Sequence, residues 1–100
     1  MTTWFISRHP GAIEWSRRQG LVVDEYVAHL DPLRIRAGDT VLGSLPVHLA
    51  ARVCAAGGRY HHLSVDVPEN LRGCELSADD LDRLCARLQA FDVRPDQVAR

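Results

Sequence analysis

Residues 2–11, TTWFISRHPG, decide the fold of this chain. The first six of them are mostly β-branched or aromatic, which predicts a strand over residues 2–7. Pro10 suits the first turn of a helix, because the N–H that proline lacks has no intrahelical partner there. A helix is therefore predicted over residues 10–19, and Gly20 stands where a glycine commonly ends one.

The same order of strand, turn and proline returns in residues 40–46, TVLGSLP. It predicts a short strand over residues 40–42 and a helix that begins at Pro46. Apolar residues at helical spacing follow, and the pair Gly57 and Gly58 ends the pattern. Between the two units, residues 21–30 predict a second strand and residues 31–39 a loop.

The remaining chain predicts one more strand and one more helix. Residues 59–67 give the strand, and a loop runs on to Leu76. Ser77 is an expected N-cap, because its hydroxyl can accept a hydrogen bond from the first turn. The apolar face of this last helix is formed by Leu81, Leu84, Cys85 and Leu88.

Strands that alternate with helices are typical of a parallel sheet with helices packed on it. We therefore expect an α/β fold, a compact open parallel sheet of about four strands flanked by three helices. A chain of 100 residues has the size of one domain. That domain is expected over residues 1–92, with a polar C-terminal tail at 93–100.

Composition narrows the classes of function. The net charge is −1, which argues against a protein that binds long nucleic acid, although all twelve basic residues are arginines.

The three cysteines are odd in number and lack CxxC spacing. Cys54 and Cys85 are expected as small core residues, and Cys74 lies in a predicted loop. No signal peptide or membrane-spanning run is recognised, so a cytoplasmic protein without a membrane partner is expected.

Ligands of open parallel sheets bind beyond the carboxyl ends of the strands. The first strand ends in a turn where Arg8 can contact phosphate oxygens and His9 can exchange protons near neutral pH. Ser7 adds a hydroxyl, Pro10 begins the helix, and Gly11 would let a ligand approach the backbone. The alternative is that Arg8 and His9 are exposed loop residues and that Ser7 caps the helix.

The second turn offers Gly43, Ser44 and Leu45, whose backbone N–H groups could face a phosphate. It lacks the Walker A lysine, and an ordinary strand-to-helix turn is the alternative. His48, in the first turn of the second helix, is a further candidate for binding and proton transfer.

A metal site is not expected. His61 and His62 are adjacent on a predicted strand and so point to opposite faces. Asp31 and Asp66 both end strands and could hold Mg²⁺ together, but turn and capping roles are commoner for such aspartates. Trp15 could stack on a base, although its helical position favours packing.

Several runs together carry a family likeness, and they cover about residues 1–91. The sequence resembles a small CRISPR-associated family encoded beside type III CRISPR systems, in the runs WFISRHPGA at 4–12, HLD at 29–31, GDTV at 38–41, GSLPV at 43–47, YHHL at 60–63 and RGCELS at 72–77.

The resemblance implies a Rossmann-like ring nuclease that binds and linearises a cyclic oligoadenylate messenger, cyclic tetraadenylate by family analogy. Such enzymes switch off type III CRISPR signalling. The implied reaction is metal-independent and needs no cofactor, since the ribose 2′-hydroxyl attacks the adjacent phosphate and leaves a 2′,3′-cyclic phosphate. We assign catalysis to Ser7, Arg8 and His9, and ligand binding to Pro10, Gly11, Gly43, Ser44, Leu45 and His48. A homodimer with the ring across its two-fold axis is expected.

Other functions remain open at this stage. The domain could bind cyclic oligoadenylate without cutting it, as a sensor or sponge. Arg8 and His9 faintly resemble the motif of phosphohistidine phosphatases, but Pro10 intervenes and the chain is too short for the further residues that such a site needs. An accessory subunit of a larger complex is also compatible with the size and charge.

Overall fold

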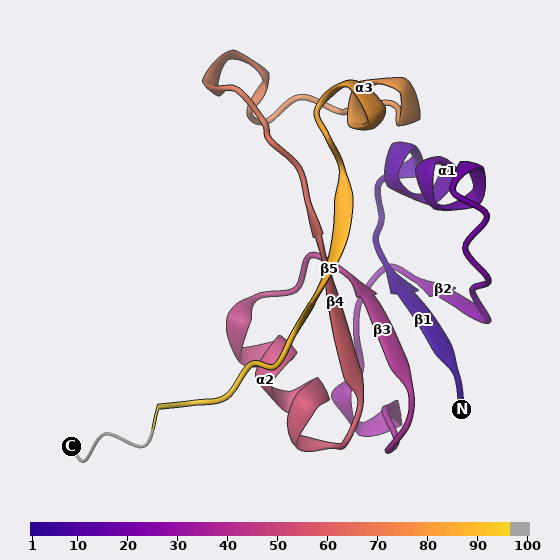
Figure 1. Ribbon diagram of the computed structural model, residues 1–100, viewed down its shortest axis with the longest axis vertical. Helices are drawn as coiled ribbons and strands as arrows, with labels where there is room; N and C mark the ends of the chain where they lie inside the picture. The colour runs from indigo at the N-terminus through magenta and orange to yellow at the C-terminus, as the bar shows by residue number, and fades with distance from the viewer. Residues whose placement is uncertain (97–100) are drawn as a thin grey trace.

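A computed structural model describes residues 1–96 as a mixed α/β fold, with one five-stranded sheet between helices (Figure 1). The spatial order of the strands is β2-β1-β3-β4-β5. Four strands are parallel neighbours, and the fifth joins the edge in the opposite direction. Their bounds are β1 Thr3–Ile6, β2 Glu25–Val27, β3 Thr40–Gly43, β4 Arg59–Ser64 and β5 Arg87–Phe91.

Helix α2 (Val47–Ala55) covers one face of the sheet, and α1 (Pro10–Arg18) and α3 (Ala78–Arg83) lie together over the other. Two short 3-10 helices, η1 (Pro32–Arg34) and η2 (Glu69–Leu71), lie in the connections. The sheet therefore separates two apolar clusters. Val41 and Val53 are fully buried in the cluster under α2, and Phe5 is fully buried in the cluster under α1 and α3.

Both prolines mark helix starts, as predicted. Pro10 is the first residue of α1, while Pro46 is the N-cap of α2. Ser77 caps α3 as expected: its Oγ accepts a hydrogen bond from the N–H of Asp80 at 3.1 Å. The second strand is shorter than the predicted 21–30, because its regular pairing with β1 is confined to Glu25–Val27.

The predicted extension of the last helix to Leu88 is wrong. Helix α3 ends at Arg83, and Cys85 adopts a left-handed conformation with φ of 58°, which ends helical geometry. Leu88 instead belongs to β5, where it lies opposite Leu63. Cys85 is exposed rather than a core residue, whereas Cys54 is half-buried in α2.

The start of the predicted tail packs on the domain. Val93 lies against the cluster under α2, and its N–H donates to Cys54 Sγ at 3.4 Å. Residues 97–100 of that predicted tail lie outside the described residues. Within residues 1–96, none of the helices combines the length and apolar character that a membrane span requires.

Candidate functional site

The strand order creates a crevice between β1 and β3. The chain leaves β1 for β2 on one side and later returns to β3 on the other side. The connections after β1 and β3 therefore diverge to opposite faces of the sheet and leave a gap at the carboxyl ends of these strands. Such a switch point is the usual ligand site of an open α/β sheet.

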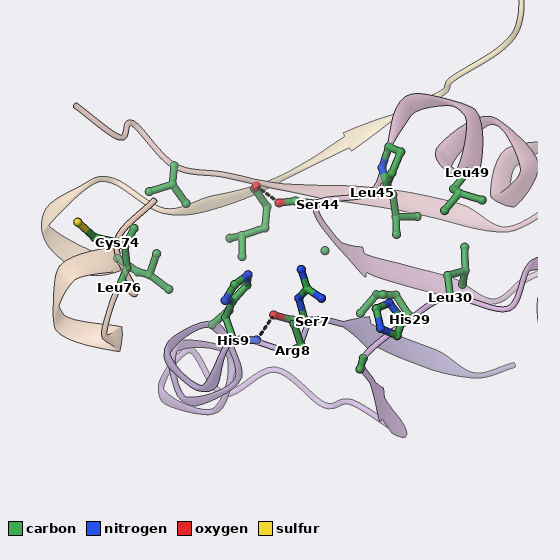
Figure 2. Close-up of a pocket in the computed structure, with 18 residues that line it drawn as sticks. Ser7, Arg8, His9, His29, Leu30, Ser44, Leu45, Leu49, Cys74 and Leu76 are labelled. Atoms are coloured by element: carbon green, nitrogen blue, oxygen red, sulfur yellow. Dashed lines mark hydrogen bonds between the residues drawn. The ribbon is translucent and has the colours of Figure 1, made fainter. Parts of the chain in front are cut away.

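A cleft of about 760 Å³ lies at this point (Figure 2). Its volume falls in the range of roughly 300–1,000 Å³ that small-molecule sites occupy. The wall mixes several polar side chains with a larger apolar part. The polar or ionisable members are Ser7, Arg8, His9, His29, Ser44 and Cys74, and the apolar ones include Leu30, Leu45, Leu49, Leu63 and Leu76.

The turn after β1 presents a cation to the cleft. Figure 2 shows the guanidinium of Arg8 directed into the space between the two turns. In the described part of the chain, Arg8 has no carboxylate within ion-pair distance. Ser7 shapes the turn, because its Oγ accepts a hydrogen bond from the N–H of His9 at 3.1 Å. Ser7 does not cap α1 by its side chain: the N-cap is His9, and the hydroxyl of Ser7 binds only the N–H of that residue.

His9 also lines the cleft, and its ring is held from outside the turn. Its Nδ1 lies 3.3 Å from Oε1 of Glu75, which precedes α3. Both side chains are more than half exposed, so the pair is accessible to solvent. The contact leaves Nε2 of His9 as the ring nitrogen that is not engaged with Glu75.

Pro10 and Gly11, which were predicted from the sequence to bind the ligand, do not line the cleft. The space above Gly11 is filled by the carbonyl group of Leu76, against which a Cβ on Gly11 would collide. The absence of a side chain at Gly11 therefore serves packing between α1 and the segment before α3. This explanation replaces the expected approach of a ligand to that backbone.

The turn after β3 is held by Tyr60 of β4. The phenol oxygen accepts a hydrogen bond from the N–H of Leu45 at 2.9 Å and lies 3.1 Å from the carbonyl oxygen of Gly43. It also lies 2.5 Å from Nδ1 of His62. Burial raises the pKa of Tyr60, so the phenol stays neutral in the folded protein. Ser44 Oγ donates to the carbonyl of Leu63 at 2.7 Å, which fixes the same turn to β4.

The structure thus brings Ser7, Arg8 and His9 together with Gly43, Ser44 and Leu45 around one cleft. His48 is exposed on α2 and is not among the lining residues. His29, just beyond β2, lines the cleft but was not among the predicted site residues. The signal for it was its place at the carboxyl end of a predicted strand.

The other candidates have structural roles. Trp15 is buried, with its Nε1 donating to Asp82 at 3.1 Å, so it is not free to stack on a base. Asp31 accepts a hydrogen bond from the N–H of Leu33, and Asp66 pairs with Arg87 at 3.2 Å. Across residues 1–96, three or more His, Cys, Asp or Glu side chains nowhere gather closely enough to hold a metal ion.

Chemically, the cleft combines a fixed positive charge, two imidazoles and apolar surface. A guanidinium binds phosphate oxygens in a planar, two-pronged manner. An imidazole can take or give a proton at neutral pH. Leucine side chains can pack on the flat faces of nucleobases. These properties fit a phosphodiester that joins nucleosides.

Comparison with known proteins adds one match. Residues 4–94 match the model of a family described as "Putative CRISPR-associated protein (Cas_VVA1548)". No significant match is found among curated proteins or among solved structures.

Proposed function

The chain belongs to this CRISPR-associated family, and from that premise we propose that it binds a cyclic oligoadenylate in the cleft between β1 and β3 and linearises it. The observation that carries the proposal is the guanidinium of Arg8, which faces the cleft without a carboxylate partner in the described residues. Arg8 is an exposed cation at the switch point of the sheet. A cation placed there favours an anionic ligand, and each linkage of the ring supplies one phosphate.

The reaction that we propose uses a nucleophile of the substrate itself. The ribose 2′-hydroxyl attacks the adjacent phosphorus, which leaves a 2′,3′-cyclic phosphate and a 5′-hydroxyl. The protein must hold the attacking oxygen in line with the leaving oxygen and stabilise the charge on the phosphoryl oxygens. Arg8 stabilises the charge on the phosphate, His9 assists proton transfer, and Ser7 offers a hydroxyl at the wall of the cleft.

The test is incubation of the protein with cyclic tetraadenylate, with and without EDTA, followed by chromatography of the products. We expect linear oligoadenylate in both samples. Loss of cleavage in EDTA would contradict the metal-independent reaction. An intact ring that still binds in a titration would identify a sensor or sponge, and an intact ring without binding would reject this ligand.

Arg8 provides the sharpest variant. Arg8→Gln removes the charge at the cleft, and a hydrogen bond to a charged group contributes about 1.5–3 kcal/mol. We therefore expect the affinity for cyclic tetraadenylate to fall by roughly 10- to 100-fold. Arg59→Gln is the matched control, because Arg59 is exposed at the opposite end of β4. Equal affinities of the two variants in a calorimetric titration would refute the role of Arg8.

A further inference from the structure

We propose that His29 is the general acid of this site, which donates a proton to the 5′-oxygen that leaves, while His9 acts as the base. The inference rests on the proposed function and adds a catalytic residue to it. Cleavage of a phosphodiester by its own 2′-hydroxyl requires two proton transfers, one from the attacking oxygen and one to the leaving oxygen. One imidazole in the cleft accounts for only one of these transfers.

The composition of the cleft wall points to His29. Four of its side chains can ionise, namely Arg8, His9, His29 and Cys74. Arginine keeps its proton under all relevant conditions, so it cannot serve as an acid. Cys74 lies beside Leu76, on the far side of His9 from Arg8 (Figure 2). His29 is therefore the proton donor available on the other side of the cation.

The positions of the two histidines suit an in-line reaction. His9 follows β1, and His29 follows β2, so they come from separate connections of the sheet. In Figure 2 they stand on opposite sides of the guanidinium of Arg8. The attacking and leaving oxygens also lie on opposite sides of the phosphorus. A phosphate held by Arg8 would therefore present one oxygen toward each imidazole.

Glu75 decides which histidine is the base. A carboxylate at 3.3 Å from Nδ1 of His9 favours the form of the ring with its proton on Nδ1. Nε2 of His9 then carries a lone pair that can accept the proton of the 2′-hydroxyl. In the described part of the chain, His29 has no carboxylate within ion-pair distance that would hold it in that form.

The proposed step balances in atoms and charge. The 2′-O–H bond breaks as its proton moves to Nε2 of His9, and the 2′-oxygen bonds to phosphorus. The bond between phosphorus and the 5′-oxygen breaks, and that oxygen takes a proton from the imidazolium of His29. Proton exchange with water afterwards restores both rings.

A sulfur-substituted ring tests this role directly. In it, sulfur replaces the 5′-bridging oxygen of cyclic tetraadenylate, and a thiolate leaves without needing a proton. We expect His29→Ala to slow cleavage of the oxygen ring by roughly 10²-fold or more and to cleave the sulfur ring at nearly the wild-type rate. His9→Ala should slow the cleavage of both rings. Equal slowing of both rings by His29→Ala, or of neither, would overturn the assignment.

Controls separate this inference from the proposed function. His61→Gln removes an imidazole from β4, outside the cleft lining, and should cleave both rings like the wild type. His29→Gln repeats the test if His29→Ala does not fold, as judged by thermal unfolding. A wild-type protein that cleaves neither ring rejects the proposed function itself, whereas a cleaving wild type with a fully active His29→Ala variant rejects only the role of His29.

Discussion

At the scale of single residues, Asp39 ties the first strand to the loop before β3. Its buried carboxylate accepts hydrogen bonds from the N–H of Thr2 at 2.9 Å, the N–H of Arg36 at 3.1 Å and Nε1 of Trp4 at 3.3 Å. These donors, the N–H of Thr2 foremost, hold the pKa of Asp39 below its ordinary value of 3.8. A carboxylate with a lowered pKa stabilises the fold above the ordinary pKa, and this contribution is lost as the pH falls through the folded value.

We therefore predict that Asp39→Asn lowers the free energy of unfolding by about 1–3 kcal/mol at neutral pH. The difference from the wild type should shrink once the pH falls below about 4, because the wild-type carboxyl then becomes protonated as well. Urea denaturation at several pH values measures this. Asp92→Asn, at an exposed position, should change stability by less than about 0.5 kcal/mol. A difference for Asp39→Asn that does not depend on pH would contradict the explanation.

The contribution of Tyr60 to stability has the opposite pH dependence to that of Asp39, because it is lost at high pH. Tyr60→Phe deprives the N–H of Leu45 of its acceptor, so this amide should exchange its hydrogen faster in the variant. Burial raises the pKa of Tyr60, so ionisation in the unfolded chain erodes wild-type stability above about pH 10. The stability gap between wild type and variant should therefore narrow in that range. Tyr26→Phe, whose hydroxyl contacts Ser16 instead, should leave exchange at Leu45 unchanged.

Residues that follow a strand directly could be assigned to the site from the sequence, because the rule of carboxyl ends is local. Arg8 and Ser44 were found in this way. Gly11 was misread, since the group that needs its missing side chain is the carbonyl of Leu76, which is distant in sequence. Glu75 was not predicted as a site residue for the same reason, because only the folded chain brings it to His9.

At the scale of elements, the contact between α1 and the segment before α3 predicts that a glycine-to-alanine substitution in a helix lowers the stability of the fold instead of raising it. Gly11 lies in the first turn of α1, where alanine normally stabilises a helix by about 0.5–1 kcal/mol. Here the added Cβ would collide with the carbonyl of Leu76. Gly11→Ala should therefore destabilise the fold, by roughly 1–3 kcal/mol as overpacking does, in urea denaturation.

Gly73→Ala is the control for that substitution. Gly73 has a φ of +81° and nothing within 4 Å of the position of a Cβ, so only backbone strain of about 1–2 kcal/mol is expected. Their effects on cleavage should separate the two variants. Gly11→Ala displaces the segment that carries Glu75 and should weaken cleavage, whereas Gly73→Ala should not. A more stable Gly11→Ala protein would rule out the collision.

The elements that begin at a proline were predictable, because proline acts on its own neighbours. The end of α3 and the strand β5 were not predictable, since Leu81, Leu84 and Leu88 also fit one helical face. Pairing with β4 decides the outcome, and it is a contact between segments far apart in sequence. The alternation of polar and apolar residues in RLQA at 87–90 was the local sign of the strand.

At the scale of the whole molecule, one cleft is small relative to the proposed ligand. A ring of identical linkages presents equivalent phosphates in pairs, and each chain provides a single Arg8 and a single His9 at its cleft. A two-fold assembly of chains would offer the ring two identical clefts. We therefore predict that cyclic tetraadenylate binds with a stoichiometry of one ring per two chains.

Calorimetric titration of an inactive His9→Ala protein gives this stoichiometry without turnover, and sedimentation with the ring gives the mass of the complex. Two chains bound to one ring would support a site shared across a two-fold axis. One ring per chain would show that a single cleft holds the ligand by itself. In a shared site, a mixed assembly of wild-type and Arg8→Gln chains keeps one intact cleft, so its affinity should lie between those of the two pure assemblies.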